Sequence, residues 1–555
     1  MFLKTHLKKD MKKLIIILSF FGFCAYAEEI PLRIAVIQEF GQFNPITLNL
    51  ASTEAFMHFV MREMTTRSAN GKLIPDLAEK IPSLENKLAK ISTTNGVKKI
   101  KATWTIQKNA KWSDGTPVTC HDWWLGWQVG LSNNTMVTDK GMYSKIENIE
   151  WILKEPKKCN VSYSTASWTF DRDLPYPIPF HLENEPFTKW KNQKEAYDQN
   201  TNYVVNPIRT GLYNGPFQVQ EFKLGSHFIL VPNPHFYGSK AKVTKILVKH
   251  IGESNAILAS LKTKAINMVS AVGFPPDLAL SYAETEAQEP YRIFFQDSPV
   301  FQGLFINHED AFLADANVRK ALSLAIDKKK LTDAFFNSKL TPAETFIPPT
   351  ADEFKSRPAV YDVEKAKKLL DKAGWKISDK NNRVKNGKEL VIDFKTSAGI
   401  KILETIQVYI CNEFAKIQVG CSIKNQPPRV LLGDTITKGS FSLAMFGNSI
   451  LPDTSLTSLF SSKEIPTKEN SWAGGNNIRW KSVKMDQFLK DYEQENNPKK
   501  RGAILAKMES EILEQTALIP VYHRKEAAVL PDNLEGFTYL SKGTSFAFPE
   551  KWSIK

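Results

Sequence analysis

The most reactive side chains that stand together in the sequence are Cys120, His121 and Asp122, inside the stretch Trp104–Trp124. A cysteine beside a histidine could form a nucleophile with its general base, and such a group could also bind a metal. Both uses require the side chains to converge on one point. Neighbouring residues of a helix point about 100° apart, so Cys120 and His121 do not face each other there. This stretch is therefore interpreted as structural.

The residues around this group predict a strand, a turn and a helix. Trp104 and Ile106 alternate with polar neighbours, as in a half-buried strand. Asp114-Gly115 favours a tight turn, because glycine adopts a positive φ without strain. Thr119 stands three residues before Asp122, which is the spacing of a helix capping box. We expect a helix to begin at this point.

No catalytic motif appears elsewhere in the chain. The sequence contains no nucleophile elbow, no zinc-protease pair of histidines and no phosphate-binding glycine loop. His227 and His235 flank one predicted strand, but no third metal ligand stands near them. We expect no catalytic residue, metal or cofactor. A secreted hydrolase is an alternative that would need a nucleophile and base that the sequence does not offer.

The N-terminus has the pattern of a secretory signal. Lys12-Lys13 precede an apolar run that is too short to cross a bilayer, and Ala25-Tyr26-Ala27 follows as a cleavage motif. We expect cleavage after Ala27 and a periplasmic protein, while the start at Met1 or Met11 stays open. The whole chain of 555 residues is too long for a single core and predicts two or three lobes.

The charge excludes one class of partner. The chain has a formal net charge of +14, and residues 1–27 hold five Lys and one Asp, so the mature chain has about +14 − 4 = +10. Lys and Glu are scattered, with no arginine-rich helix or basic–aromatic ladder. We therefore expect no nucleic-acid partner.

Cleavage of the signal leaves Cys120, Cys159, Cys411 and Cys421. An even number of cysteines in an oxidising compartment predicts two disulfides. Pairing Cys120 with Cys159 and Cys411 with Cys421 closes the shortest loops. The other two pairings, and buried free thiols, remain alternatives.

The strand, turn and helix at Trp104–Trp127 resemble the signature of the family 5 extracellular solute-binding proteins, the peptide- and nickel-type receptors of ABC importers. In one later segment, Arg319 and Asp327 are expected to fix a helix within its lobe. The other segments that resemble the family follow in its order across nearly the whole mature chain: Glu39–Ile46, Lys72–Leu84, Thr210–Gly238, Phe305–Leu331, Lys401–Ile423 and Met485–Val529.

This resemblance implies an α/β fold: a two-lobed periplasmic binding protein of the Venus-flytrap, class II type, with an extra subdomain on lobe I. Two crossing strands, near Ser298–Asn307 and Thr516–His523, would form the hinge. The implied division is a signal peptide at 1–27, lobe I at 28–52, 204–298 and 518–555, the extra subdomain at 53–203, and lobe II at 299–517.

The resemblance also implies a function. The lobes would close over a peptide or peptide-like solute, and an ABC permease in the inner membrane would receive it from a monomeric receptor. Ligand contacts are implied by position, with plain packing as the alternative for each residue. They are Asn49, Leu50 and Ala51 from lobe I, Phe446, Gly447, Asn448, Ser449, Ile450 and Asp453 from lobe II, and Tyr143 and Tyr522.

One departure from the family concerns the ligand. In peptide-binding members, an Asp at the end of a lobe II strand pairs with the α-amino group of the peptide. Ile450 stands at that position here, and an apolar side chain cannot pair with an ammonium group. A shift of three residues would instead place Asp453 there. The ligand alternatives are therefore a metal chelate, haem, a sugar or a peptide derivative without a free amine.

Overall fold

A computed structural model describes most of the chain from residue 31 onward. The predicted signal segment and its cleavage site after Ala27 lie outside the described residues. Within the described parts, no helix combines the length and the apolar composition needed to cross a bilayer. The described residues are 31–47, 50–68, 72–137, 140–172, 174–270, 279, 282, 290–351, 353–450, 455–470, 472–539 and 546–555.

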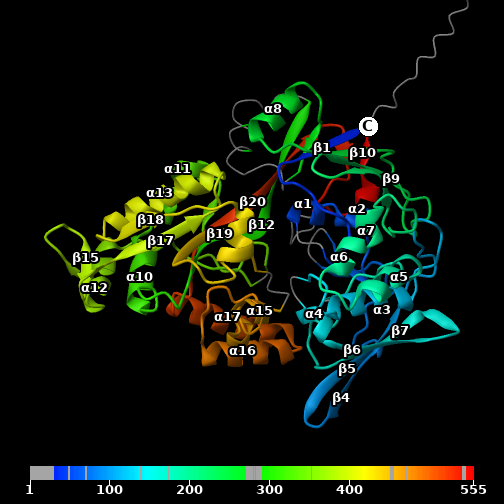
Figure 1. Cartoon of the computed structure of the whole chain (residues 1–555), viewed down its shortest axis with the longest axis horizontal. Coiled ribbons are helices and arrows are strands. Elements are labelled where there is room, and N and C mark those ends of the chain that lie inside the picture. Colours follow the sequence, from blue (N-terminus) through cyan, green and yellow to red (C-terminus); the bar gives the residue numbers. More distant parts are fainter. Residues whose placement is uncertain are drawn as a thin grey trace, which may run out of the picture.

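One 11-stranded mixed sheet extends through both halves of the molecule (Figure 1). A short strand, β13 (Thr341–Pro342), pairs with β20 beside the main path. Along that path the order is β18 (Gly420–Ile423), β17 (Val391–Thr396), β19 (Leu443–Ser449), β12 (Tyr291–Ile306), β20 (Leu518–Pro531), β11 (Met268–Val269), β1 (Leu32–Val36), β10 (Ile246–His250), β9 (His227–Pro232) and β8 (Phe217–Lys223).

Parallel strand pairs occur in both halves, and in each half a helix connects two strands of the parallel set. Strand β1 pairs parallel with β10 and β11, and α8 (Ser254–Lys262) connects β10 to β11. Strand β17 pairs parallel with β18 and β19, and α13 (Lys401–Ala415) connects β17 to β18. Parallel neighbours need such a crossover, because both strands must start at the same end of the sheet. The predicted α/β fold is confirmed.

Two long strands join the halves. β12 has 16 residues and β20 has 14, and they pair antiparallel from Tyr291 and Pro531 at one end to Phe305 and Leu518 at the other. Their register is interrupted between Asp297 and Phe301. An interruption removes ladder hydrogen bonds, so this is the point where the strand pair bends most easily.

The right half in Figure 1 carries β1 and β8–β10, with a four-stranded antiparallel sheet below them in the order β4, β5, β7, β6. The left half carries β17–β19 with α10–α13, and α15–α17 lie below this part of the sheet. The small-sheet strands are β2 (Thr65–Arg67), β3 (Leu73–Pro75), β4 (Ala89–Thr94), β5 (Val97–Thr105), β6 (Ile146–Ile152), β7 (Glu155–Tyr163), β14 (Lys376–Ile377), β15 (Arg383–Lys385), β16 (Lys388–Glu389), β21 (Leu534–Glu535) and β22 (Ser553–Ile554).

Most helices are short and pack on the sheets. Short helical turns also occur at η2 (Leu431–Thr435), η3 (Ser462–Glu464) and η4 (Pro549–Lys551). Among the described residues, the α-helices besides α8 and α13 are α1 (Ala51–Glu54), α2 (Met57–Val60), α3 (Cys120–Leu131), α4 (Gly141–Ser144), α5 (Phe180–Trp190), α6 (Ala196–Asn200), α7 (Asn202–Val205), α10 (Ala316–Ala325), α11 (Lys328–Phe336), α12 (Val363–Lys372), α14 (Pro428–Val430), α15 (Thr457–Phe460), α16 (Val483–Gln494) and α17 (Pro498–Glu514).

The predicted strand, turn and helix around Cys120 are confirmed. Strand β5 ends at Thr105, Gly115 turns with φ +90°, and α3 begins at Cys120. The Asp122 carboxylate accepts hydrogen bonds from the Thr119 backbone N–H at 2.6 Å and from its hydroxyl at 3.1 Å. These bonds satisfy groups that the start of a helix otherwise leaves unpaired.

Both disulfides follow the sequence-local pairing. Cys120 pairs with Cys159 and joins α3 to β7, and Cys411 pairs with Cys421 and joins α13 to β18. Cys120 therefore offers no thiolate. The His121 ring packs 4.2 Å from the Trp151 ring, between centroids, so both residues have structural roles.

The hydrophobic core does not separate the predicted extra subdomain from lobe I. One continuous cluster contains Trp104 and Trp123 of the subdomain together with Phe228 and Ile246 of the main sheet. The left half has three further clusters: two of them pack on opposite faces of β12, β19 and β20, and a small one lies around Leu431. One more cluster in the right half includes the buried face of α8. The predicted extra subdomain and most of lobe I therefore share one core.

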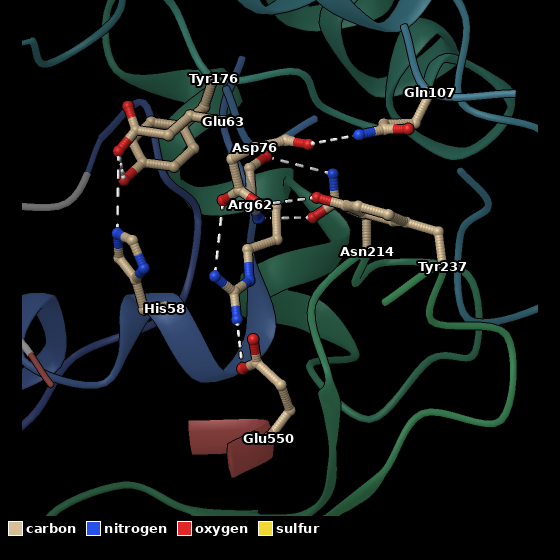
Figure 2. A network of polar contacts seen from close by, with 9 residues as sticks. All are labelled: His58, Arg62, Glu63, Asp76, Gln107, Tyr176, Asn214, Tyr237 and Glu550. Atoms are coloured by element: carbon tan, nitrogen blue, oxygen red, sulfur yellow. Dashed lines mark hydrogen bonds and ion pairs between the residues drawn. The ribbon is translucent and has the colours of Figure 1, made fainter. Parts of the chain in front are cut away.

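A buried charged network holds the right half together (Figure 2). Arg62, with 1% of its side chain exposed, donates to Glu550 near the C-terminus at 2.6 Å and to Asp76 at 3.4 Å. Tyr237 donates its hydroxyl to Asp76 at 2.7 Å, and the Arg62 backbone N–H donates to the side chain of Asn214. The network ties α2, the subdomain and the C-terminal segment to one guanidinium group.

Glu63 and His58 lie at the edge of this network and are both neutral at pH 7. Burial raises the pKa of Glu63 to about 8, and the nearby Asp76 carboxylate adds to the effect. Burial lowers the pKa of His58 to about 3, with a further contribution from Arg62. Their 3.8 Å contact is therefore not an ion pair at neutral pH, and the Tyr176 hydroxyl also contacts Glu63, at 3.2 Å.

Glu63→Gln is expected to remove part of the pH dependence of stability. The folded pKa of about 8 exceeds the usual 4.5, so the folded state binds the extra proton between these values. The contribution of Glu63 to the free energy of unfolding is thus full below pH 4.5 and is lost as pH rises toward 8. Over this range the free energy of unfolding falls by at most about 1.4 kcal/mol per pH unit. Glutamine mimics the protonated acid, so the variant should gain stability relative to wild type over this window.

Chemical denaturation at several pH values measures this difference. Glu185→Gln, at an exposed position of α5, is the matched control and should follow the wild-type profile. Parallel profiles of wild type and Glu63→Gln from pH 4.5 to 8 would contradict the assignment.

Candidate ligand-binding site

An apolar pocket, here called the β19 pocket, lies in the left half against β12, β19 and β20. It encloses about 120 Å³. Apart from Leu518 at the start of β20, its walls come from the predicted lobe II. The lining residues are Phe305, Phe446, Asn448, Ile450, Leu459, Phe460, Gly475, Asn477, Ile478 and Leu518.

Strand alternation explains which predicted residues of β19 line this pocket. Phe446 and Asn448 lie on one face, while Gly447 and Ser449 alternate to the other and are exposed. A Cβ at Gly447 would lie 3.0 Å from a methyl group of Val300, on the face away from the pocket. The structure thus brings Phe446, Asn448 and Ile450 together, and leaves Gly447 and Ser449 outside the pocket.

Two aromatic rings form a rigid part of the wall. Phe305 and Phe446 stack with centroids 3.9 Å apart and planes at 12°. Ile450, at the end of β19, is 2% exposed and packs in the same cluster as Phe460. The residue at the predicted amine-binding position is therefore a buried part of an apolar wall.

The remaining wall is a loop that the sequence analysis missed. Gly474 has φ +115°, and a Cβ there would lie 2.3 Å from the carbonyl oxygen of Glu464. A Cβ at Gly475 would lie 2.9 Å from the carbonyl oxygen of Ser458. Only glycine allows this close approach of two backbones. The run of Gly474, Gly475, Asn476 and Asn477 was the available signal, since such runs mark special backbone geometry.

Two asparagines of this loop differ in their environments. Asn476 donates from its side chain to the carbonyl oxygens of Ser461 and Trp480, both at 2.9 Å, which fixes the loop. Asn477 lines the pocket, and its buried Oδ1 accepts no hydrogen bond from any described residue. Within the described ranges, no three His, Cys, Asp or Glu side chains gather as metal ligands.

Of the predicted ligand contacts from lobe I, Leu50 is not among the described residues that line this pocket. Asn49 lies outside the described residues, as does Asp453 of lobe II. Ala51 is the first residue of α1. Leu50 is half-buried, and its carbonyl oxygen accepts from the N–H groups of Thr53 and Glu54, so it begins that helical turn.

The two tyrosines proposed as weaker contacts are core residues. Tyr143, 3% exposed, packs so closely on α3 that a Cβ at Gly130 would lie 2.0 Å from its ring. Tyr522, also 3% exposed, packs against Phe336 with ring centroids 4.9 Å apart. Both side chains therefore have packing partners in the structure, and their contact with a solute stays a prediction.

A contact between the halves lies beside the pocket. Trp168, from the loop after β7, is 4% exposed and enters the left-half cluster that contains Tyr492. The guanidinium group of Arg501 lies 3.8 Å from the centroid of its ring, and the Tyr492 ring meets it edge-on at 5.6 Å. We call this contact the Trp168 latch. It joins the loop after β7 to α16 and α17.

Glu493 connects the latch to the pocket wall. Its carboxylate accepts from the Ser167 hydroxyl at 3.0 Å and lies 3.6 Å from Lys145, both on the subdomain. The other carboxylate oxygen accepts from Thr457 at 3.4 Å. Thr457 is the first residue of α15, the helix that supplies Leu459 and Phe460 to the pocket. Latch and pocket therefore share one helix.

The chain belongs to a family of solute receptors. Residues 72–466, more than half of the chain, match the bacterial extracellular solute-binding proteins, family 5 Middle. This confirms the predicted family and its class, a binding protein that is not an enzyme. The oligopeptide-binding protein OppA of Lactococcus lactis subsp. cremoris is 28% identical over 408 residues, which cover 62% of this chain and 63% of that relative's length.

Solved structures share the fold over almost the whole chain. An oligopeptide-binding protein from Thermus thermophilus, in complex with a pentapeptide, has a TM-score of 0.80 at 22% identity, over 93% of this chain and 94% of that one. NikZ from Campylobacter jejuni, in complex with Ni(L-His), has a TM-score of 0.77 at 21% identity, over 94% and 99%.

Proposed function

We propose that this protein is the substrate-binding component of an ABC importer, which captures a peptide or peptide-like solute and delivers it to a permease in the inner membrane. The family match over residues 72–466 carries this proposal. The name of the Lactococcus relative and the pentapeptide of the Thermus structure support a peptide. The signal pattern ending at Ala27 and the two disulfides suit a periplasmic location.

Closure of two lobes would perform the capture. A solute that contacts both lobes binds the closed arrangement better than the open one, and so shifts the population toward closed. β12 and β20 would bend where their pairing is interrupted, and the permease would recognise the closed monomer. In this proposal lobe I comprises 28–52, 204–298 and 518–555, its extra subdomain comprises 53–203, and lobe II comprises 299–517.

A second candidate is a solute without a free amine. No Asp or Glu occurs among the described residues that line the β19 pocket. The family resemblance implies Ile450 at the position of the amine-binding acid, with Asp453 as the alternative if the alignment shifts by three residues. An ammonium group buried there without a partner would be costly. The fold does not select the ligand class, because NikZ carries Ni(L-His) on the same fold.

Native mass spectrometry of protein purified without refolding separates these candidates. We expect co-purified masses that differ by amino-acid residues and fragment as peptides. A single discrete non-peptide mass, such as a metal chelate, haem or a sugar, would overturn the peptide proposal and favour the second candidate.

A further inference from the structure

We propose that the β19 pocket is a specificity site that takes one apolar side chain of the solute, between leucine and phenylalanine in size. The inference rests on the proposed function and adds the chemical class that the site selects. It concerns the side chain alone, and applies equally to a free peptide and to a peptide derivative without an amine.

The volume of the pocket sets the size of its occupant. Its 120 Å³ is close to the roughly 150 Å³ of an apolar protein cavity that holds one benzene molecule. Pockets for whole drug-sized ligands measure roughly 300–1,000 Å³. The β19 pocket therefore admits one side chain while the rest of the solute lies outside it.

The walls select an apolar occupant. The stacked rings of Phe305 and Phe446, with Ile450, Leu459 and Phe460, present carbon surface. No Lys, Arg, Asp or Glu is among the described lining residues, so a charged side chain inside would lose its water without gaining a partner. A leucine or phenylalanine side chain instead gains by leaving water.

Asn477 adds a polar requirement at one point of the wall. Its Oδ1 is buried and has no partner among the described residues, and an acceptor in that state is costly. An N–H or O–H group of the solute that enters beside the apolar side chain would supply the missing donor. Backbone N–H groups of a peptide stand next to every side chain, so a peptide meets both requirements together.

Pocket occupancy is also connected to the contact between the halves. An occupant touches Leu459 and Phe460, and α15 is held at its first residue, Thr457, by Glu493 of the Trp168 latch. A side chain that fills the pocket supports α15 in the position that the latch requires. The same group thus contributes to selection and to closure.

A pentapeptide series tests the proposal by calorimetry. Four residues are alanine, and the fifth is Leu, Phe, Trp, Ser or Glu at each position in turn. At one of the five positions, the peptides that carry Leu or Phe should bind at least about tenfold more tightly than the peptide that carries Ser, and the peptide that carries Glu should bind most weakly. Asn477→Leu removes the acceptor and should weaken the binding of every peptide in the series about tenfold.

Variants of Leu459 change the pocket size in both directions. Leu459→Ala enlarges the pocket and should move the preference from Leu toward Trp, while Leu459→Trp fills it and should abolish the preference for Leu and Phe. A reversal of rank order cannot come from lost stability alone. Leu153→Trp, at a position that is 88% exposed on the subdomain, is the matched control and should keep the wild-type order.

The outcomes are distinct. Peptide binding with no preference for an apolar residue at any position, or a preference that neither Leu459 variant alters, would overturn the inference and leave the proposed function standing. Failure of every peptide to bind, with a non-peptide mass in the purified protein, would overturn both.

Discussion

Trp168→Ala is expected to weaken solute binding about 100-fold and to shift the protein toward an open arrangement. Trp168 is 4% exposed and fills a site made by Tyr492 and Arg501 of the opposite half. Truncating a buried tryptophan typically costs on the order of 3 kcal/mol, part of it from the lost cation–π contact. In the proposed closure these contacts form only when the halves meet, so the loss would fall on the closed state and reduce the apparent affinity by the same factor.

Small-angle scattering and calorimetry measure the two effects. At a peptide concentration that saturates the wild type, the radius of gyration of Trp168→Ala should be larger than that of wild type. It should fall to the wild-type value only at far higher peptide concentrations. Trp190→Ala, on α5 of the same subdomain beside Lys189, is the matched control and should bind as wild type does. Equal affinities for wild type and Trp168→Ala would exclude a role for the latch in closure.

Arg62→Met is expected to lower the free energy of unfolding of the right half by about 3–5 kcal/mol, the usual cost of removing one partner from a buried ion pair. The substitution leaves the carboxylates of Asp76 and Glu550 without the cation that they share. The Arg62 side chain is 1% exposed, so water does not replace the lost partner. Chemical denaturation followed by tryptophan fluorescence measures the change.

The double variant Arg62→Met with Glu550→Gln provides the internal control. Glutamine removes one of the two orphaned charges, so the double variant should recover part of the stability that the single variant loses. A single variant that unfolds at the wild-type denaturant concentration would show that the network contributes nothing net.

The sequence predicted local structure well where one side chain decides it. Thr119 and Asp122 form their capping interaction three residues apart, and Asp327 accepts from the Lys330 N–H at the start of α11. Arg319, predicted to fix its helix, donates to the carbonyl oxygens of Leu313 and Gln515. The two capping interactions depend on short spacing, which a sequence states directly, whereas the bond from Arg319 to Gln515 spans 196 positions.

The candidate site was predicted only in part, because its walls are distant in sequence. Alternation along β19 separates Phe446 and Asn448 from Gly447 and Ser449, but the strand pattern alone does not say which face carries the pocket. The wall at Gly475 exists because two backbones approach closely, and no periodicity signals this.

The latch and the charged network were missed for a related reason. Trp168 stands in an irregular segment, where a single aromatic residue predicts neither burial nor a partner more than 300 residues away, such as Glu493. Arg62 meets Glu550 across 488 positions of the sequence. Tyr143 was assigned to the ligand by its position alone, and its close fit against Gly130 is a contact that position in the sequence does not indicate.

The most direct measurement is a crystal structure of the protein with the solute that co-purifies with it. We predict the halves closed over a peptide, with one apolar side chain in contact with Phe446, Ile450 and Leu459. A solute bound elsewhere, while the β19 pocket holds only water, would contradict a receptor that selects its ligand by this pocket.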